Sequence, residues 1–527
     1  MQAQTVAMPK RLPLIIEPEN RNDSTVKDAK LVNAYIERNQ KTGETWIYKR
    51  PGLVQTLATK SGNGLGAYYW NGAVYSIFGA NLYRDDTDTS STLDTTGGVY
   101  RFTSNIGNEL ANGVTTTLVF NTAVAGYGAP PGFPATQIIA RTSTPAGSFV
   151  IGTTYVISVL GTTNFIAVGS SFNIVGWSFT ATGIGVGTGS AWLNTNYPYN
   201  AVKGIVYLDG LFYVTNINAS VRGSSTINDP YKWADPLNRL TAQIEADLAV
   251  FTAKQLSYVI VFKEWSTEVF YDQKNPTASA LGPVQGAKVN YGCVTADSVR
   301  EIDGSLCWLS QNRSGSVQVM IMEALKPVIV STKAIERILD AATFGTVFSF
   351  AFKYNGHKFY GVTLKDNNIT LVYDLVDQFW SQWTDTNGNY WPMVSATFNA
   401  TQDVILQHET NGKLYKFDAL TYLDDGALFS AQIVTPNFDG GTRRRKALAV
   451  LEFVGDQVAG STLQVRSNDS DYDATKWTNF RYLDLGARRP LLVNCGTFIR
   501  RAYELTHRSN TPLRIQALEM QLDLGTL

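Results

Sequence analysis

One short pattern recurs along this chain and constrains its fold more than any other feature. Its clearest copy is GIVYLDGLFYV at residues 204–214, where an apolar run meets Asp-Gly and an alternating aromatic run follows. An Asp-Gly or Asn-Gly corner between such runs indicates a β-hairpin, because a type I′ turn requires positive φ at both central residues. The chain is therefore expected to contain a series of antiparallel hairpins.

Related hairpin patterns recur at spacings typical of a propeller. Four further copies carry Asn-Gly or Asp-Gly, and one apolar pair lacks the glycine, so the corners fall at Asn71, Asp209, Glu264, Asp303, Asn355 and Asn411. Most steps between corners are about 40–55 residues, which is the period of propeller blades. We predict an all-β fold based on an irregular β-propeller of about six blades. A long β-sandwich or a stack of hairpins is the simpler alternative.

The step from Asn71 to Asp209 is too long for one blade, and its composition differs from the rest. Residues 85–135 are rich in Thr, Gly, Asn and Pro and indicate loop and weak strand, whereas 147–192 contain short apolar strands. In residues 428–527, apolar and polar residues alternate, as in strands with one wet face. The predicted parts are an N-terminal arm and first blade (1–84), an inserted β unit with Gly/Thr-rich loops (85–200), the remaining propeller (201–427) and a C-terminal β-sandwich-like domain (428–527). Short helices are predicted within 237–256 and 332–339.

Composition argues against several classes of function. Lys plus Arg and Asp plus Glu both number 44, so the net charge is zero and nothing global favours binding to a nucleic acid polyanion. Three cysteines without a CxxC pair indicate reduced, buried thiols. The N-terminus lacks an apolar signal region, and no apolar run reaches roughly eighteen residues, so no membrane segment is expected.

The sequence predicts no catalytic, cofactor or metal site. None of the three histidines has a partner at metal-ligand spacing, and the glycine-rich stretches lack the Lys of a phosphate loop. The acidic turn at 469–473 lacks the Gly and Glu of a calcium-binding loop. Two carboxylates such as Asp424 and Asp425 could still serve a glycosidase. A carbohydrate-directed propeller, either glycan-binding or a glycosidase, therefore remains the alternative.

Basic residues cluster in the last hundred residues. Arginine forks suit carboxylate or phosphate partners, so several clusters in one domain favour an interface with an acidic protein or a DNA backbone. For any one cluster, a solvated loop is the simpler interpretation. The residues predicted to make an assembly or DNA-proximal contact are Arg443, Arg444, Arg445, Lys446, Arg488 and Arg489.

A set of strings, taken in order, resembles a known family. They are LVNAYIE (31–37), YKRPGL (48–53), DPYKW (229–233), VFKEWSTEVFY (261–271), GHKFY (356–360), TLVYD (370–374) and PLRI (512–515). The series resembles the tail nozzle proteins of short-tailed bacteriophages, also called packaged-DNA stabilisation or tail hub proteins. Within its opening motif, Asn33, Arg50, Pro51 and Gly52 are interpreted as structural, because Pro-Gly sets a turn and Arg50 can bond carbonyls.

This resemblance implies a structural protein of the virion tail, made in the host cytoplasm, and not an enzyme. It implies a homo-hexamer below the portal adaptor ring, the head-to-tail connector. Such a ring would extend the DNA channel, help retain packaged DNA until ejection, and anchor tail fibres, spikes or a plug. Genomic DNA would pass without sequence-specific binding, and a neutral protein suits that role because each phosphate contact adds affinity. No cofactor is implied.

Overall fold

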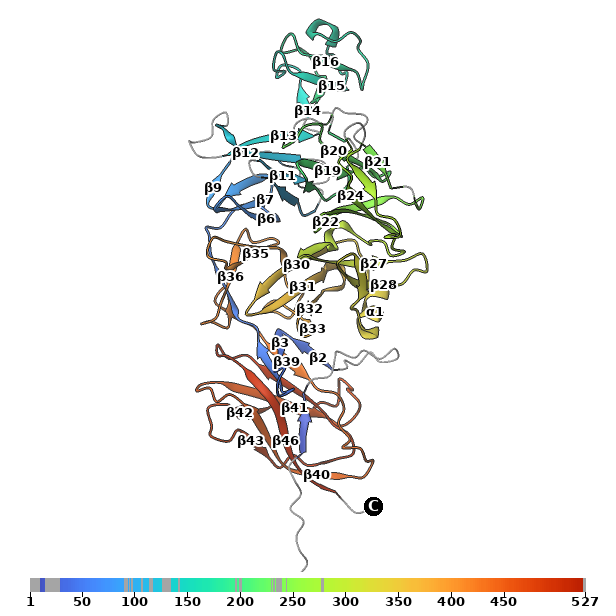
Figure 1. The fold of residues 1–527 in the computed structure, drawn as a ribbon. Helices are drawn as coiled ribbons and strands as arrows, with labels where there is room; N and C mark the ends of the chain where they lie inside the picture. Colours follow the sequence, from blue (N-terminus) through green and yellow to red (C-terminus); the bar gives the residue numbers. More distant parts are fainter. Residues whose placement is uncertain are drawn as a thin grey trace, which may run out of the picture.

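The computed structural model describes residues 10–14, 29–89, 93, 95, 98–105, 108–112, 117–125, 134–140, 143–194, 197–198, 201–228, 230, 233, 239–242, 244–275 and 279–524. Almost all of its regular structure is β, and this confirms the predicted fold class. The molecule is elongated, with an inserted β unit at one end, a C-terminal sandwich at the other and the propeller between them (Figure 1).

Seven four-stranded antiparallel blades form the propeller in the described part of the chain. The first four are β6 (Gly64–Trp70), β7 (Ala73–Phe78), β8 (Asn81–Arg84) and β9 (Thr87–Asp88); β10 (Arg101–Ser104), β11 (Asn108–Asn112), β12 (Thr117–Ala125) and β13 (Pro134–Ala140); β18 (Val206–Leu208), β19 (Leu211–Thr215), β20 (Ser220–Gly223) and β21 (Arg239–Thr241); and β22 (Ala249–Gln255), β23 (Tyr258–Lys263), β24 (Thr267–Asp272) and β25 (Leu281–Pro283).

The last three blades complete the ring. They are β26 (Arg300–Ile302), β27 (Ser305–Gln311), β28 (Val317–Glu323) and β29 (Lys326–Ile329); β30 (Val347–Tyr354), β31 (His357–Leu364), β32 (Ile369–Asp374) and β33 (Phe379–Gln382); and β34 (Met393–Phe398), β35 (Val404–His408) and β36 (Leu414–Asp418) with β5 (Gly52–Gln55). The strand β5 pairs antiparallel with β36. An N-terminal strand thus closes the last blade, and β34 contacts β6 of the first.

The propeller has one blade more than the predicted six. The strands β10–β13 form a complete sheet, although the sequence of this segment indicates loop and weak strand. The strand β10 contacts both β6 and β18, and this position between two blades gives the segment a partner on each side. Strand formation depends on such context more than on intrinsic preference. The predicted insertion at 85–200 therefore contains two separate sheets.

The hairpin corners have the backbone that their sequences require. Asn71 and Gly72 have φ of 46° and 83°, and Asp209 and Gly210 have φ of 46° and 92°. Corresponding positive values occur at Asp303, Gly304, Asn355 and Gly356. Each of these corners joins the first and second strands of a blade, whereas those at Glu264 and Asn411 join the second and third. This difference explains the irregular spacing in the sequence.

A central cavity of about 430 Å³ lies between the blades. It is lined by residues of the first strand of every blade, including Tyr68, Arg101, Tyr207, Lys254 and Arg300. A cavity bordered by all seven first strands is the central channel of a closed propeller.

The inserted unit is a small sheet with its own core. Its strands are β14 (Ser143–Pro145), β15 (Thr154–Val159), β16 (Ser178–Thr180) and β17 (Ser190–Leu193), with a 3₁₀ helix η1 (Phe165–Val168). The aromatic rings of Phe149, Tyr155, Phe165 and Phe179 pack together inside it. Its first and last strands pair with each other, so the unit leaves the propeller as two adjacent strands (Figure 1).

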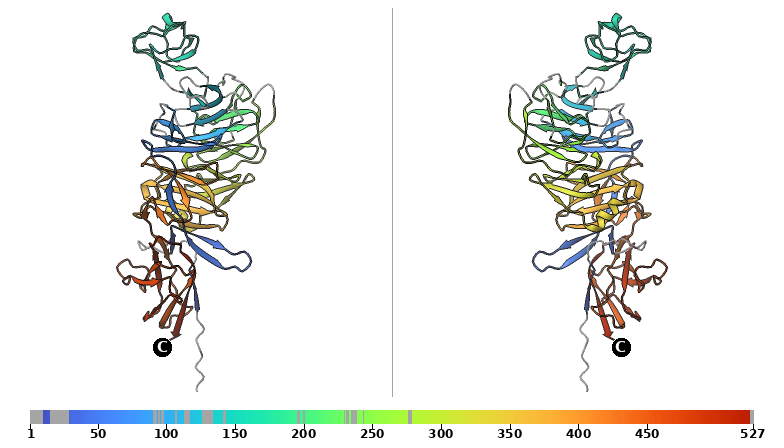
Figure 2. Two further views of the ribbon diagram at one scale, coloured as in Figure 1. Left: turned by 90° about the vertical axis from the view of Figure 1, so that its left-hand side faces the viewer. Right: turned by 90° about the vertical axis from the view of Figure 1, so that its right-hand side faces the viewer.

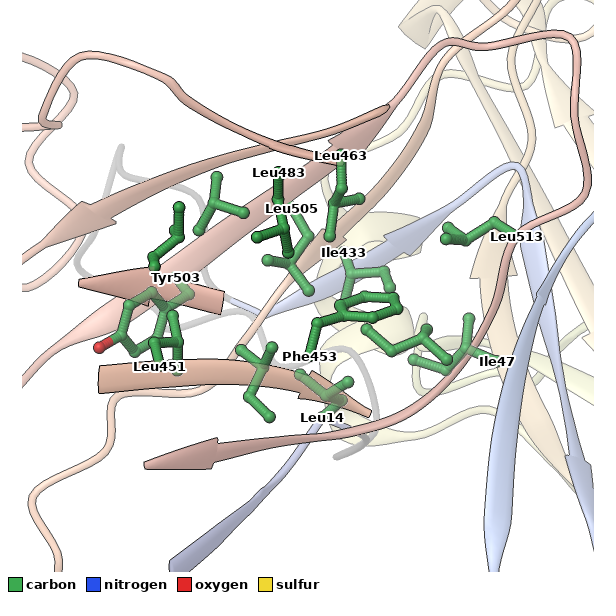
Figure 3. Close-up of a cluster of buried hydrophobic side chains, with 14 of the residues drawn as sticks. Leu14, Ile47, Ile433, Leu451, Phe453, Leu463, Leu483, Tyr503, Leu505 and Leu513 are labelled. Atoms are coloured by element: carbon green, nitrogen blue, oxygen red, sulfur yellow. The ribbon is translucent and has the colours of Figure 1, made fainter. Parts of the chain in front are cut away.

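Both ends of the chain build the C-terminal sandwich. One sheet contains β1 (Lys10–Pro13), β3 (Ala34–Arg38), β4 (Thr45–Lys49), β40 (Lys446–Gly455), β43 (Leu491–Val493), β44 (Thr497–Phe498) and β46 (Arg514–Leu524). The other contains β2 (Lys30–Val32), β39 (Ala431–Val434), β41 (Thr462–Asn468), β42 (Arg481–Asp484) and β45 (Ala502–His507). Leu14, Ile47, Ile433, Leu451 and Phe453 share the core between the sheets (Figure 3).

The sandwich is continuous with the propeller. The strand β2 pairs with β39 on one side and with β33 of the sixth blade on the other, which joins the two parts into one nine-stranded sheet. The β3–β4 hairpin projects sideways at this level (Figure 2). The N-terminal residues thus contribute to the sandwich as well as to the last blade. Two short strands, β37 (Leu423–Asp424) and β38 (Ala427–Leu428), lead from the last blade into the sandwich.

Helices are few in the described residues. The predicted helix at 332–339 is confirmed as α1 (Lys333–Asp340), where Thr332 accepts a capping hydrogen bond from the amide of Ile335. The helix predicted within 237–256 is wrong, because this segment supplies β21 and β22 to neighbouring blades. Two 3₁₀ turns, η2 (Ala296–Ser298) and η3 (Lys365–Asn367), complete the set. None of the helices described here has the length and apolar character to cross a membrane.

Candidate functional site

A buried ion pair joins the N-terminal segment to the end of the propeller. The side chain of Arg50, directly after β4, is fully buried and donates two hydrogen bonds to the carboxylate of Asp424, at 2.9 and 2.5 Å. It also donates to Oδ1 of Asn33 at 3.1 Å and to the carbonyl of Thr384 at 3.2 Å, and it lies 3.9 Å from the ring centre of Phe429. A buried guanidinium requires such complete compensation.

Asn33 uses both ends of its amide in the same network. Its Nδ2 donates to Oγ1 of Thr384 at 2.7 Å and to the carbonyl of Ser430 at 2.8 Å, while its Oδ1 accepts from the amide of Thr384 at 2.8 Å. Asn33 has φ of 52°, which Asn tolerates better than most residues, at the point where the chain passes from β2 to β3. We call Asn33, Arg50, Thr384, Asp424 and Ser430 the junction.

The Pro-Gly pair of the opening motif lies against the junction. The carbonyl of Pro51 accepts from Nη1 of Arg50 at 3.2 Å. A Cβ at Gly52 would lie 2.2 Å from the carbonyl oxygen of Leu423, so no other residue fits there without moving the backbone. The structure thus brings together Asn33, Arg50, Pro51 and Gly52, and the site holds two β-sheets and a blade in fixed register.

The basic run before β40 forms an exposed loop. Arg443, Arg444 and Arg445 are all exposed, and none has an ion-pair partner among the described residues. We call these three residues the basic loop. It lies at the end of the sandwich remote from the propeller, because β40 starts opposite Leu524 near the C-terminus (Figure 1). These three cations, which have no ion-pair partner in the part of the chain that the structure describes, are available to an anionic partner.

Lys446 does not belong to this exposed set. Its side chain is buried, and its ammonium donates to the carbonyls of Thr442, Arg444 and Ile499, each at 2.8 Å. It therefore holds the shape of the loop and is not available at the surface. Its inclusion among the predicted contact residues is corrected on this ground.

Arg488 and Arg489 lie apart from the basic loop. They precede β43 near the opposite end of β40, since the carbonyl of Pro490 bonds the amide of Phe453. That is seven residues from Lys446, or roughly 23 Å along a strand. Arg489 also forms a two-bonded ion pair with Glu452, so its charge is largely compensated.

A further arginine pair, Arg500 and Arg501, binds carboxylates of the acidic turn at 469–473. Arg501 donates to both carboxylate oxygens of Asp469, at 2.6 and 2.8 Å, and Arg500 pairs with Asp471 at 2.8 Å. Two of the three carboxylates in the turn that resembles the start of a calcium loop therefore already have counter-ions within the fold.

The carboxylates considered for glycoside hydrolysis are also engaged. Asp424 belongs to the junction, and Asp425 pairs with Lys413 at 2.6 Å, which lowers the pKa of this carboxyl. Glu245, beside two surface grooves of about 840 Å³ each, pairs with Lys288 and Arg313, and the Lys288 hydrogen bond lowers its pKa. A general acid needs a raised pKa, so Asp425 and Glu245 are not arranged for that role, and both oxygens of Asp424 are bound by Arg50.

One histidine lies in a compact cluster with two carboxylates. The Nδ1 of His357 is 2.6 Å from Asp374 and 3.5 Å from Asp377. Burial lowers the pKa of His357, but the hydrogen bond and charge of Asp374 more than offset this, and the pKa is raised. The short contact is that of an Nδ1–H hydrogen bond to a carboxylate, which leaves no space for an ion between Nδ1 and Asp374.

The pKa of His408 is shifted in the opposite direction, and this predicts that the fold loses stability at acidic pH. Its Nδ1 accepts from the amides of Thr410 and Asn411, and burial lowers its pKa to about 4. Because the unfolded chain binds this proton near pH 6.5, stability falls as the pH drops from 6.5 to about 4, by at most about 1.4 kcal/mol per pH unit. His408→Asn should keep the turn through its amide oxygen and lose less stability. Urea unfolding at pH 6.5 and 4.5 measures this, and equal losses in both proteins would contradict it.

Several residues of these sites carry no signal in the sequence. Asp424 and Thr384 are more than 330 positions from Arg50, so only the closed ring brings them together. Two buried thiols, Cys293 and Cys307, are free, as the sequence predicts. Burial raises the pKa of the Cys293 thiol to about 12 and makes it unreactive.

These features define a class of protein. A seven-bladed propeller is closed by an N-terminal strand, carries a projecting β unit and continues into a sandwich with an exposed basic loop. The ion pair of the junction joins the propeller to the sandwich and the basic loop faces outward, while other charged pairs, such as Lys263 with Asp247, are buried inside the propeller.

The family comparison is more specific. A family model described as "Bacteriophage P22 Gp10, beta-propeller", of the phage stabilisation type, matches residues 145–422, which is more than half of the chain. The chain belongs to this family of phage structural proteins. The resemblance found in the sequence is thereby confirmed, as is the propeller fold.

Solved structures give more distant likenesses. Raptor from Chaetomium thermophilum has a TM-score of 0.36 at 9% identity, covering 70% of this chain and 29% of that one. The WD40 β-propeller domain of Doa1 has 0.35 at 10%, covering 71% and 97%, and YCF48 bound to D1 peptide has 0.36 at 13%, covering 73% and 99%. This chain thus spans under a third of the Raptor chain. No curated protein matches it.

Proposed function

We propose that this protein is the tail nozzle of a short-tailed bacteriophage. Six copies form a ring below the portal adaptor, extend the DNA channel, help retain the packaged genome until ejection, and anchor tail fibres, spikes or a plug. The observation that carries the proposal is the family match over residues 145–422. The role is structural and the location is the virion tail, after synthesis in the host cytoplasm.

The architecture supports a protein whose propeller and sandwich form a rigid body and whose inserted unit projects from it. The nine-stranded sheet and the junction join propeller and sandwich by main-chain pairing and a buried ion pair. Displacement of one part relative to the other would break both. The inserted unit, by contrast, is attached by two adjacent strands and has its own core.

A six-fold ring requires two different contact patches on each copy. The basic loop is a candidate for one of them, because three exposed arginines that lack counter-ions among the described residues suit an acidic surface on a neighbouring ring or the DNA backbone. The net charge of zero also suits DNA that must slide.

Substituting the basic loop should weaken assembly and leave the fold intact. In the triple variant Arg443→Ser, Arg444→Ser, Arg445→Ser, each substitution is expected to change the free energy of unfolding by less than about 0.5 kcal/mol, because the side chains are exposed. Its binding to the adaptor ring, or its retention of genome in assembled particles, should fall at least about tenfold, since each charged contact is worth roughly that.

A control for net charge is available on other exposed elements. Lys274, Lys326 and Lys333 are exposed and lie on the propeller, so replacing all three with Ser makes the same charge change elsewhere. This control should assemble normally. Normal assembly of the arginine variant, or an equal defect in both variants, would remove the basic loop from the interface.

A further inference from the structure

One end of the propeller channel contains an unusual set of charges. Arg101 begins β10, Arg300 begins β26, Lys203 precedes β18, and Asp297 lies in η2. Lys203 donates to both oxygens of Asp297 at 2.7 Å, and Arg101 is 3.7 Å from the same carboxylate. Cations from two neighbouring blades thus meet at one carboxylate.

Asp297 does not balance these charges. Arg300 bonds only neutral oxygens among the described residues, namely the carbonyl and hydroxyl of Ser349 at 2.9 and 3.0 Å and the carbonyl of Val394 at 3.2 Å. Among the described residues, the cluster of Arg101, Lys203, Arg300 and Asp297 therefore holds three cations and one anion, with two positive charges in excess. Further along the channel, Lys254 and Glu301 add one charge of each sign and leave the excess unchanged.

Arg101 is also incompletely bonded. It is 7% exposed, its Nη2 donates to the carbonyl of Ala296 at 2.8 Å, and its Nε is buried without a hydrogen-bond partner in the described residues. A buried donor without a partner is costly, and a buried charge without a counter-ion more so. Both Arg101 and Arg300 line the central cavity of about 430 Å³, so an occupant of the cavity can reach them.

The pKa shifts of the three cations agree with the excess of positive charge. Burial lowers the pKa of Arg300, and the neighbouring charge of Arg101 lowers it further. Burial also lowers the pKa of Arg101 and of Lys203, against the opposing effect of Asp297. An anion in the channel would oppose all three effects.

We propose that this end of the propeller channel binds a small oxyanion of the phosphate class, held between the guanidinium groups of Arg101 and Arg300. Guanidinium forks match phosphate oxygens and donate in pairs. The cavity is large enough for free phosphate, for pyrophosphate or for the phosphate groups of a nucleotide. The anion would act as a counter-ion that ties the second and fifth blades across the channel, a role independent of the proposed assembly function.

Calorimetric titration and thermal unfolding of the full chain test this proposal. Phosphate, pyrophosphate and ATP are the three probes, each compared with sodium chloride at equal ionic strength. We expect Tm to rise with probe concentration, because a ligand of the folded state stabilises it by mass action. Strongest binding by ATP would identify a nucleotide, and equal binding of pyrophosphate and ATP would identify the phosphate groups alone.

Two variants are expected to change the anion affinity in opposite directions. Arg101→Gln should weaken binding about tenfold or more, since it removes one charged donor, whereas Asp297→Asn should tighten it, since it removes the competing carboxylate. The basic loop triple variant should bind like the wild type. No effect beyond sodium chloride in the wild type, unchanged binding by Arg101→Gln, or weaker binding by a folded Asp297→Asn would each overturn the proposal.

Discussion

Replacing Arg50 with Met is expected to lower the free energy of unfolding by about 3–5 kcal/mol, the usual cost of breaking a buried ion pair from one side. The side chain of Arg50 has no exposed surface, and that of Asp424 is 13% exposed. The substitution would leave this carboxylate without its counter-charge and Asn33 without one donor. Denaturant unfolding followed by intrinsic fluorescence measures the change.

The chain offers a control of the same geometry at the surface. Arg489 also makes two hydrogen bonds to one carboxylate, that of Glu452, but its side chain is 67% exposed. Arg489→Met should cost less than about 1 kcal/mol, because exposed pairs are worth little. The double variant Arg50→Met, Asp424→Leu should be more stable than Arg50→Met alone, since no buried charge remains unpaired. Equal costs for Arg50→Met and Arg489→Met would show that the junction is not a stabilising site.

The closure of the ring by β5 leads to the second large effect. Leu53 is 2% exposed and belongs to the core beneath the last two blades, while its neighbour Val54 is 38% exposed on the same strand. Leu53→Ala should destabilise the protein by about 2–5 kcal/mol, as for other buried leucines. Val54→Ala should cost less than about 1 kcal/mol, because its side chain is partly in water already.

Limited proteolysis adds a test of what Leu53→Ala loosens. If β5 completes the last blade, its release exposes the edge of β36, so cleavage should accelerate first between β36 and β38 and within the N-terminal segment. Cleavage that begins instead in the inserted unit, or equal stability of the two variants, would mean that β5 does not hold the ring closed.

The hairpins explain how much of this fold is predictable from the sequence. An Asn-Gly or Asp-Gly corner is a local signal, because the backbone at residues such as Asn71 and Asp209 is set by the two residues themselves. The number of blades cannot be predicted from such local signals alone. The β10–β13 sheet has weak strand character in its sequence and forms between two stronger blades, so counting corners gives one blade too few.

The origin of the sandwich is not predictable from local patterns. Strands of the last hundred residues show clear alternation, but the sequence does not reveal that β1 and β4 pair with β46, more than 460 positions away. The same holds for the junction and the channel. Arg50 is recognisable within a motif, whereas its contact with Asp424, and the approach of Arg101, Lys203 and Arg300 to one another, depend on closure of the ring.

The clusters of basic residues show a second reason why a site is not predictable from the sequence alone. All the predicted contact residues look alike in the sequence, yet their surroundings differ. The ammonium of Lys446 is bound by three carbonyls and the charge of Arg489 by Glu452, which leaves the basic loop and Arg488 exposed. Hydrogen-bond satisfaction, and not charge density along the chain, separates a surface cation from a structural one.

The central claim is that six copies form a ring on the portal adaptor, and the most direct measurement is the mass of the purified chain in solution with particle images of the same sample, alone and after addition of the adaptor ring. Six-fold rings with a central channel are expected, with a protein mass six times 57.9 kDa above that of the adaptor. A chain that remains a monomer in the presence of the adaptor would contradict it and would favour a carbohydrate-directed propeller.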